Sequence, residues 1–139
     1  MNYQSSFRCL LLLVGVALVG CGGGSSSAVR VTGKVTREGK PLEVKAMVGK
    51  VNIVFEPMDA SVNGGSKEYA IYKPDGSFEV PGKDGRGLPP GKYRICIMQY
   101  DSFPGPDSLK DKFGEGKSPL IREVNASNHH FEIDVATAK

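Results

Sequence analysis

The sequence predicts an all-β protein: a single antiparallel β-sandwich of about seven strands, preceded by a signal peptide. Apolar and polar residues alternate at every second position, and turn signals with Gly, Pro or Asp recur about every ten residues. After the N-terminal apolar stretch, no segment carries the apolar stripe of a helix. These observations divide the chain into a signal peptide at 1–20, a linker at 21–28 and a β-sandwich domain at 29–139.

The first 20 residues have the pattern of an export signal. Residues 1–8 carry one charge, at Arg8, and residues 10–19 are uninterrupted apolar or glycine residues. A helix of that length rises only about 15 Å, about half the thickness of a bilayer core. The segment is therefore predicted to be a cleaved signal peptide and not a transmembrane span.

The residues at the predicted cleavage site resemble the lipobox of bacterial lipoproteins. They read Leu18-Val19-Gly20-Cys21 and are followed by a Gly/Ser linker. The resemblance implies cleavage between Gly20 and Cys21, a diacylglycerol on the Cys21 thiol, and a further acyl chain, typically palmitate, on the new amino group. Two or three such chains anchor a protein stably. Gly22, where inner-membrane lipoproteins often carry Asp, implies an outer-membrane location in the cell envelope. The alternative is an ordinary secretory signal with a coincidental cysteine.

Composition places few further limits on function. Removing residues 1–20 removes one Arg and no acidic residue, so the net charge falls from +3 to +2. The charges are interspersed, which does not favour nucleic acid as a partner. Cys9 lies in the signal, and Cys96 is then the only cysteine besides Cys21. An internal disulfide is therefore not expected.

The first half of the domain contains two predicted strands. Residues 29–35 alternate valines with polar residues, and REGKPL at 37–42 has the composition of a turn. Residues 51–56 alternate again before Pro57, which is expected to end the strand. Residues 43–49 are expected to form an arm or a bulge ahead of that second strand.

The second half begins with a predicted hairpin. Pro74-Asp75-Gly76 separates a strand at 70–72 from one at 78–80, because proline presets one turn angle and glycine accepts a positive φ. The longest predicted strand is 93–100, and the last is 131–135. The strand at 93–100 is predicted to place Tyr93, Ile95 and Ile97 on one face and Arg94, Cys96, Met98 and Tyr100 on the other.

A long polar segment, 101–128, interrupts this rhythm and is predicted to be a binding loop or a partly ordered excursion. With the residue before it, it supplies Tyr100, Phe103 and Phe113, the one place where exposed aromatic residues are expected to gather. Such a cluster predicts contact with a partner protein or a glycan. The alternative is that the rings fold the loop back over an open edge of the sandwich.

Several motifs together resemble the carboxypeptidase regulatory-like, or transthyretin-like, domain. The resemblance covers about residues 29–135 and implies an immunoglobulin-like or transthyretin-like sandwich that acts as a non-catalytic accessory or binding module. The last motif also resembles the tail of small bacterial lipoproteins built on that domain. The sequence departs from the pattern at VKAMVGK, which has the character of an insertion. The motifs are VTGKVTREGKPL, VNIVFEP, KPDGSFEV, GLPPGKYRICI and KSPLIREVNASNHHFEIDV.

Catalytic and nucleotide-binding motifs are incomplete. GEGKS at 114–118 imitates a phosphate-binding loop, but Asp111 stands where the first glycine is needed and Pro119 stands where the helix would begin. Transthyretin-like hydrolases would need a histidine early in the domain, and both histidines lie near its end. Neither a catalytic residue nor a cofactor is therefore predicted.

Metal ligands and reactive thiols are not favoured either. His129 and His130 are neighbours at the entry to the last predicted strand. Neighbours on a strand point to opposite faces and cannot hold one ion, so a solvated strand entry is favoured over a ligand role. Cys96 in mid-strand is predicted to be a buried or half-buried structural residue, with a nucleophilic or redox role as the alternative. The acidic residues of the long segment lack the spacing of a calcium loop, which leaves solvated charges as the favoured interpretation. They are Asp101, Asp107, Asp111 and Glu115.

The expected function is that of a lipid-anchored cell-envelope lipoprotein whose β-sandwich binds or supports something without catalysis. Its expected partners are the membrane, through Cys21, and an envelope protein or glycan. A polysaccharide or cell-wall binding module is one alternative, and an unrecognised hydrolase is another.

Overall fold

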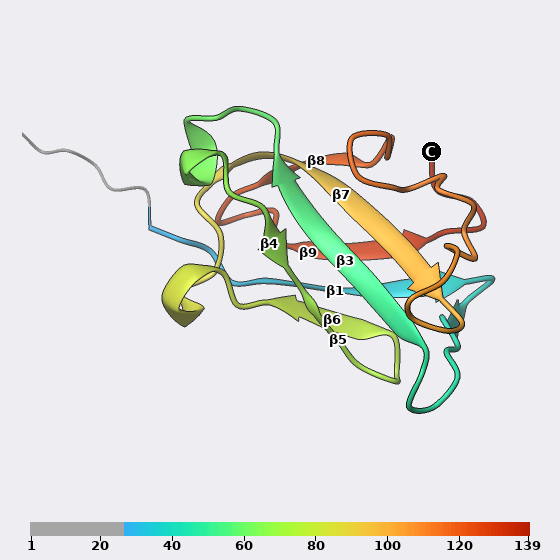
Figure 1. Ribbon diagram of the computed structural model, residues 1–139. Coiled ribbons are helices and arrows are strands. Elements are labelled where there is room, and N and C mark those ends of the chain that lie inside the picture. The colour runs from blue at the N-terminus through green and yellow to red at the C-terminus, as the bar shows by residue number, and fades with distance from the viewer. Residues whose placement is uncertain (1–26) are drawn as a thin grey trace, which may run out of the picture.

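A computed structural model describes residues 27–139 as two β-sheets packed face to face (Figure 1). The predictions for residues 1–26, which include cleavage after Gly20 and lipidation of Cys21, lie outside the described residues. Within residues 27–139, no helix is long and apolar enough to cross a membrane. The strands are β1 Val31–Arg37, β2 Lys40–Pro41, β3 Lys50–Pro57, β4 Glu68–Tyr69, β5 Ile71–Tyr72, β6 Ser77–Val80, β7 Gly91–Tyr100, β8 Ile121–Val124 and β9 His130–Asp134, with single 3₁₀ turns at Val62–Gly65 and Lys83–Gly85.

Each sheet has one dominant pairing. In the first sheet, β1 pairs with β2 and β6 on one side and with β9 on the other, and β5 extends the sheet beyond β6. In the second sheet the order is β4-β3-β7-β8, and β3 and β7 form the longest ladder, from Lys50 opposite Tyr100 to Pro57 opposite Tyr93. The all-β sandwich predicted from the sequence is therefore confirmed.

The number of strands and one pairing differ from the prediction. The described chain has nine strands and not about seven, because a further strand, β4, precedes the strand expected at 70–72, which is reduced to β5, and because the turn at 37–42 contains β2. The segment predicted as a loop, 101–128, contains β8. β9 runs parallel to β1, whereas an antiparallel sandwich was predicted, because a tight turn at 125–128 passes the chain from the second sheet to the first.

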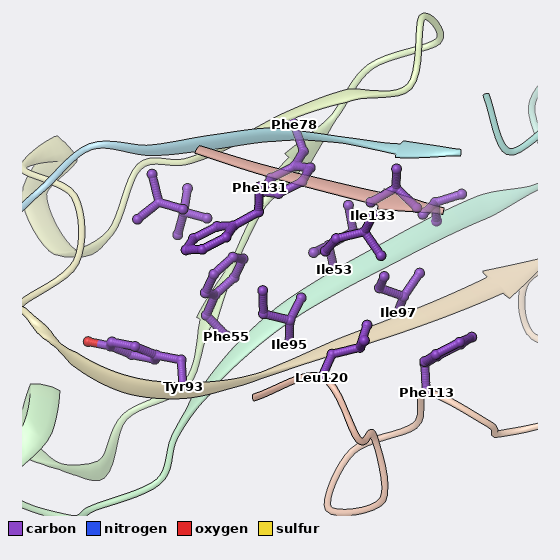
Figure 2. Packing of buried hydrophobic residues seen from close by; sticks show 14 of the residues in the cluster. Ile53, Phe55, Phe78, Tyr93, Ile95, Ile97, Phe113, Leu120, Phe131 and Ile133 are labelled. Carbon is purple, nitrogen blue, oxygen red and sulfur yellow. The ribbon is translucent and has the colours of Figure 1, made fainter. Parts of the chain in front are cut away.

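The core lies between the two sheets and contains a group of four aromatic rings. Phe55 from β3 is their common neighbour: its ring centroid lies 6.1 Å from Phe78, 6.2 Å from Tyr93 and 6.4 Å from Phe131 (Figure 2). The Tyr93 hydroxyl donates a hydrogen bond to the carbonyl of Pro89 at 2.8 Å, so the one polar atom in the group is satisfied. The predicted inner face of β7 is confirmed, since Tyr93, Ile95 and Ile97 are all fully buried.

The segment that follows β7 folds back along the open edge of this strand. Ser108 N–H donates to the carbonyl of Gln99, and Ile97 and Ile95 N–H donate to the carbonyls of Phe113 and Leu120 at 2.9 and 2.8 Å. Phe113 is fully buried in the core, so the prediction that it contributes to an exposed contact surface is wrong. The alternative prediction, a ring that folds the loop back over the sandwich edge, is confirmed for this residue.

Asp134, at the end of β9, fastens the turn between β1 and β2. Its carboxylate accepts hydrogen bonds from the N–H groups of Gly39 at 2.8 Å, Ala136 at 2.9 Å and Glu38 at 3.1 Å. These hydrogen bonds hold the pKa of Asp134 below its usual value, and the bond from Gly39 N–H has the largest effect. The turn after β1 is thereby attached to the far end of the chain.

Stability is therefore expected to fall in acid partly through Asp134. The pKa of Asp134 is lower in the folded than in the unfolded chain. Its contribution to stability is therefore complete above the unfolded-state pKa, near 4, and is lost as the pH falls through the folded-state pKa. The measurement is the urea midpoint between about pH 7 and pH 3 for the native chain and for Asp134→Asn. We expect the variant to lose less stability over this range, and an identical loss in both proteins would contradict the assignment.

Candidate binding groove

A groove of about 920 Å³ lies between the two sheets. Its lining includes the start of β3 and residues 72–74 at the end of β5, which lie at the end of the sandwich opposite residue 27 (Figure 1). The side chains that form its interior are mainly apolar and come from both sheets. They include Leu42, Val44, Val51, Ile53, Ala70 and Tyr72.

The groove exists because the chain leaves the sandwich between β2 and β3. The loop at 42–49 forms one wall, and residues 72–74 at the end of β5 form the other. Ala70 is the point where the chain passes from β4 in one sheet to β5 in the other, so no long strand closes this side. The segment VKAMVGK, where the sequence departs from the domain it resembles, thus forms most of the first wall. The arm expected here is a loop that contains a turn, in which Gly49 N–H donates a hydrogen bond to the carbonyl of Lys45.

Two polar side chains, the buried Gln99 and the half-buried Tyr72, hold that loop in place. Gln99 is 5 % exposed, donates to the carbonyl of Glu43 at 2.6 Å and accepts a bond from Arg37 at 3.0 Å. The Tyr72 hydroxyl donates to the carbonyl of Leu42 at 3.2 Å and accepts from its N–H at 3.0 Å. Sequence reasoning missed Gln99, although it continues the inner face of β7 two residues beyond Ile97, where a polar residue is unexpected.

Exposed apolar side chains gather beside the groove. The distal patch, as we name it, consists of Val44, Met47, Val48 and Phe103, which are 36 %, 103 %, 47 % and 53 % exposed. Phe103 N–H donates to the carbonyl of Val48 at 2.7 Å, and the Phe103 ring meets that of Tyr100 edge to face at 5.3 Å. Of the three aromatic residues predicted to make contacts, Tyr100 and Phe103 therefore lie together next to the groove.

Lysines occur in and next to the segments that line the groove. Lys50 and Lys73 line it, and Lys40 and Lys45 are sequence neighbours of other lining residues. Within residues 27–139 none of the four forms an ion pair, although the Lys50 ammonium lies 5.1 Å from the centre of the Phe103 ring. The acidic residues nearby are Glu43, which lines the groove, and Asp75, which accepts hydrogen bonds from Ser77.

A second group of polar side chains lies on the outer face of the β3–β7 sheet. Glu56 forms ion pairs with Lys67 at 3.0 Å and Arg94 at 3.2 Å and accepts a bond from Gly116 N–H at 3.1 Å. Burial opposes ionisation of Glu56, but the bonds from Lys67, Gly116 and Arg94 together lower its pKa. Lys67 also pairs with Glu115, so the group fastens the segment after β7 over the sheet.

Cys96 lies beneath this group and is fully buried, which confirms its predicted place as a structural residue. Its Sγ lies 3.9 Å from a Glu56 carboxylate oxygen. Burial first, and then the negative charge of Glu56, raises the pKa of the thiol to about 11. The thiol is therefore protonated at neutral pH and is a poor nucleophile.

We accordingly expect Cys96 to resist alkylation in the folded protein. At pH 7.5, iodoacetamide should modify it at least about a hundredfold more slowly than in the urea-unfolded chain, because both burial and protonation oppose reaction. The measurement is the alkylation rate by mass spectrometry. A native rate within about tenfold of the unfolded rate would contradict the burial described here.

Two of the remaining candidate ligands, His130 and Asp107, are engaged in local structure. His130 contacts Thr32 Oγ1 at 3.0 Å through Nδ1 and Glu132 at 2.9 Å through Nε2. The Asp107 carboxylate accepts from the N–H groups of Gln99, Leu109 and Asp111, at 2.8 to 3.0 Å. Among residues 27–139, no group of three or more His, Cys, Asp or Glu side chains is arranged to hold a metal ion.

The fold and the groove define a β-sandwich with an apolar site between its sheets. Comparison of the chain with models of protein families, with curated proteins and with solved structures finds no significant match.

Proposed function

We propose that this protein is a lipid-anchored lipoprotein of the cell envelope whose transthyretin-like β-sandwich is a non-catalytic binding module. The anchor is Cys21, by its resemblance to a lipobox, and the outer membrane is the proposed location. One observation supports the binding role above the others: the groove is lined by the start of β3 and residues 72–74, which lie at the end of the sandwich opposite residue 27 (Figure 1). A tether that precedes residue 27 therefore leaves the groove facing away from the membrane.

The chemistry of the groove supports binding without catalysis. None of the described residues that line it is a histidine, cysteine or serine, and the Tyr72 hydroxyl is occupied by the backbone of Leu42. A general base and a nucleophile within hydrogen-bond reach of each other, as catalysis needs, are not found among these lining residues. Tethering itself contributes to function, because it raises the effective concentration of the domain for partners at the same surface.

The anchor is tested by growing cells with an alkyne-labelled palmitate and comparing Cys21→Ser with Cys96→Ser. The native chain and Cys96→Ser should carry the label and lose residues 1–20. Cys21→Ser should carry no label and should accumulate as the longer precursor. A native chain that is cleaved but unlabelled would instead identify an ordinary secretory signal and contradict the proposal.

The binding role is tested by placing a photo-cross-linking amino acid in the anchored protein in living cells. At Met47, which lies in the distal patch, it should capture a reproducible species that mass spectrometry can identify. At Lys83, in the 3₁₀ turn at the opposite end, it should not. If both positions give the same background, the groove end is not a binding surface.

A further inference from the structure

We propose that the groove binds an anionic amphiphile, with an acyl chain between the two sheets and a carboxylate or phosphate head among the lysines at its mouth. This inference deepens the proposed function and rests on the groove being the binding site. Three properties of the groove support it: a mainly apolar lining, few free uncharged hydrogen-bonding groups there, and two lysines against one glutamate among the lining residues.

The interior is suited to a hydrocarbon chain. A volume of about 920 Å³ is at the upper end of the range for small-molecule sites, roughly 300 to 1,000 Å³. Beneath its floor lie Val51 and Ile53 of β3, which are 8 % and 0 % exposed and belong to the main core. A ligand in the groove therefore packs on an apolar floor backed by the core, where each methylene removed from water is favourable.

The same interior is poorly suited to a sugar. A buried sugar requires a hydrogen-bond partner for most of its hydroxyls, since each unpaired one is costly. Tyr72 has both hydrogen-bonding functions of its hydroxyl engaged with Leu42. Of the other uncharged polar side chains in the lining, the Asn52 amide and the hydroxyl of Tyr69, which is 58 % exposed, make no hydrogen bond to a described residue. The groove thus favours a ligand whose polar atoms are confined to one end.

The charge at the mouth of the groove indicates that the polar end of the ligand is negatively charged. Lys50 begins β3 in one sheet and Lys73 follows β5 in the other, so the two ammonium groups belong to opposite walls. Among the lining residues they are opposed by one acidic side chain, Glu43. Because neither of these lysines is ion-paired within residues 27–139, their charges are available to an anion at the rim.

The test uses the full anchored protein in its own membranes and a long-chain fatty acid with a diazirine in mid-chain. After illumination, cross-links should map to residues 41–53 and 69–74. Lys50→Glu/Lys73→Glu should lower cross-linking about fivefold or more, because the head group then meets like charge. The matched control, Lys83→Glu/Lys92→Glu, makes the same charge change at the opposite end and should leave cross-linking unchanged. Ala46→Trp should lower it by filling the groove.

Two further probes separate the head groups. A diazirine lysophosphatidic acid should label the same residues as the fatty acid, which would show that the groove recognises a negative head group of either kind. Labelling by only one of the two acids would show whether the head group is a carboxylate or a phosphate. A diazirine fatty alcohol should label at least about fivefold less, because it has no charge for the lysines. Equal labelling by the alcohol, or labels spread evenly over the domain, would overturn the proposal.

The outcome is distinguishable from failure of the proposed function. If the cross-linker at Met47 captures a protein or glycan while no amphiphile labels the groove, the amphiphile is excluded and the binding role remains. If neither experiment gives a localised product, both proposals fail.

Discussion

Phe55→Ala is expected to destabilise the protein by about 3–5 kcal/mol. The Phe55 side chain is fully buried between the sheets and contacts three other rings, Phe78, Tyr93 and Phe131 (Figure 2). Its removal loses the transfer free energy of a large apolar group and leaves a cavity that rigid strands cannot close. Inclined ring pairs of this kind add about 0.5–1.5 kcal/mol beyond burial.

The loss is measured by urea unfolding, followed by tyrosine fluorescence because the chain contains no tryptophan. Phe103→Ala is the matched control: it makes the same chemical change at a ring that is 53 % exposed, whose neighbours are Lys50 and Tyr100. We expect the control to cost less than about 1 kcal/mol. Equal losses in the two variants would mean that Phe55 is not at the centre of the core.

Much of the fold could be predicted because its signals are local. The alternation in β1, β3 and β7 identifies which residues face inward, and the turn at 74–76 follows from the preferences of proline and glycine. What the sequence did not reveal depends on distant pairing. β4 and β5 are two residues each, too short to show a period, and the parallel placement of β9 depends on which sheet the chain enters after residue 128.

The site was predicted only in part, for the same reason. The proximity of Tyr100 and Phe103 follows from their spacing, but the burial of Phe113 depends on the path of a polar segment that has no periodicity of its own. The groove lies between residues 42–53 and 69–74, and nothing in either segment indicates that they stand apart. The one available signal was Gln99, a polar residue on an otherwise apolar strand face, which contacts the loop that forms the wall.

Gly33→Val is the second substitution with a large expected effect, because Gly33 lets β9 and a core ring approach β1. Gly33 lies opposite Phe78 of β6 and Phe131 of β9. A Cβ atom at this position would lie 2.1 Å from the backbone oxygen of Phe131 and 2.6 Å from Cζ of Phe78. The ring can turn, but the oxygen belongs to the neighbouring strand, so the two strands must separate.

We expect Gly33→Val to destabilise the protein by about 3 kcal/mol, with Gly33→Ala intermediate, because overpacked cores relieve strain only by moving backbone. Thr32→Val is the matched control. It introduces the same side chain one residue earlier, on the opposite face, and loses only the half-exposed bond to His130, so it should cost less than about 1 kcal/mol. Urea unfolding midpoints compare the stabilities of Gly33→Val and Thr32→Val. Hydrogen exchange shows where the structure is disturbed: the amides of residues 130–134 should exchange faster in Gly33→Val, because β9 is displaced. If Gly33→Val and Thr32→Val are equally stable and equally protected, then β9 does not lie against β1 at Gly33, and the parallel pairing that carries Asp134 to the β1–β2 turn is wrong as well.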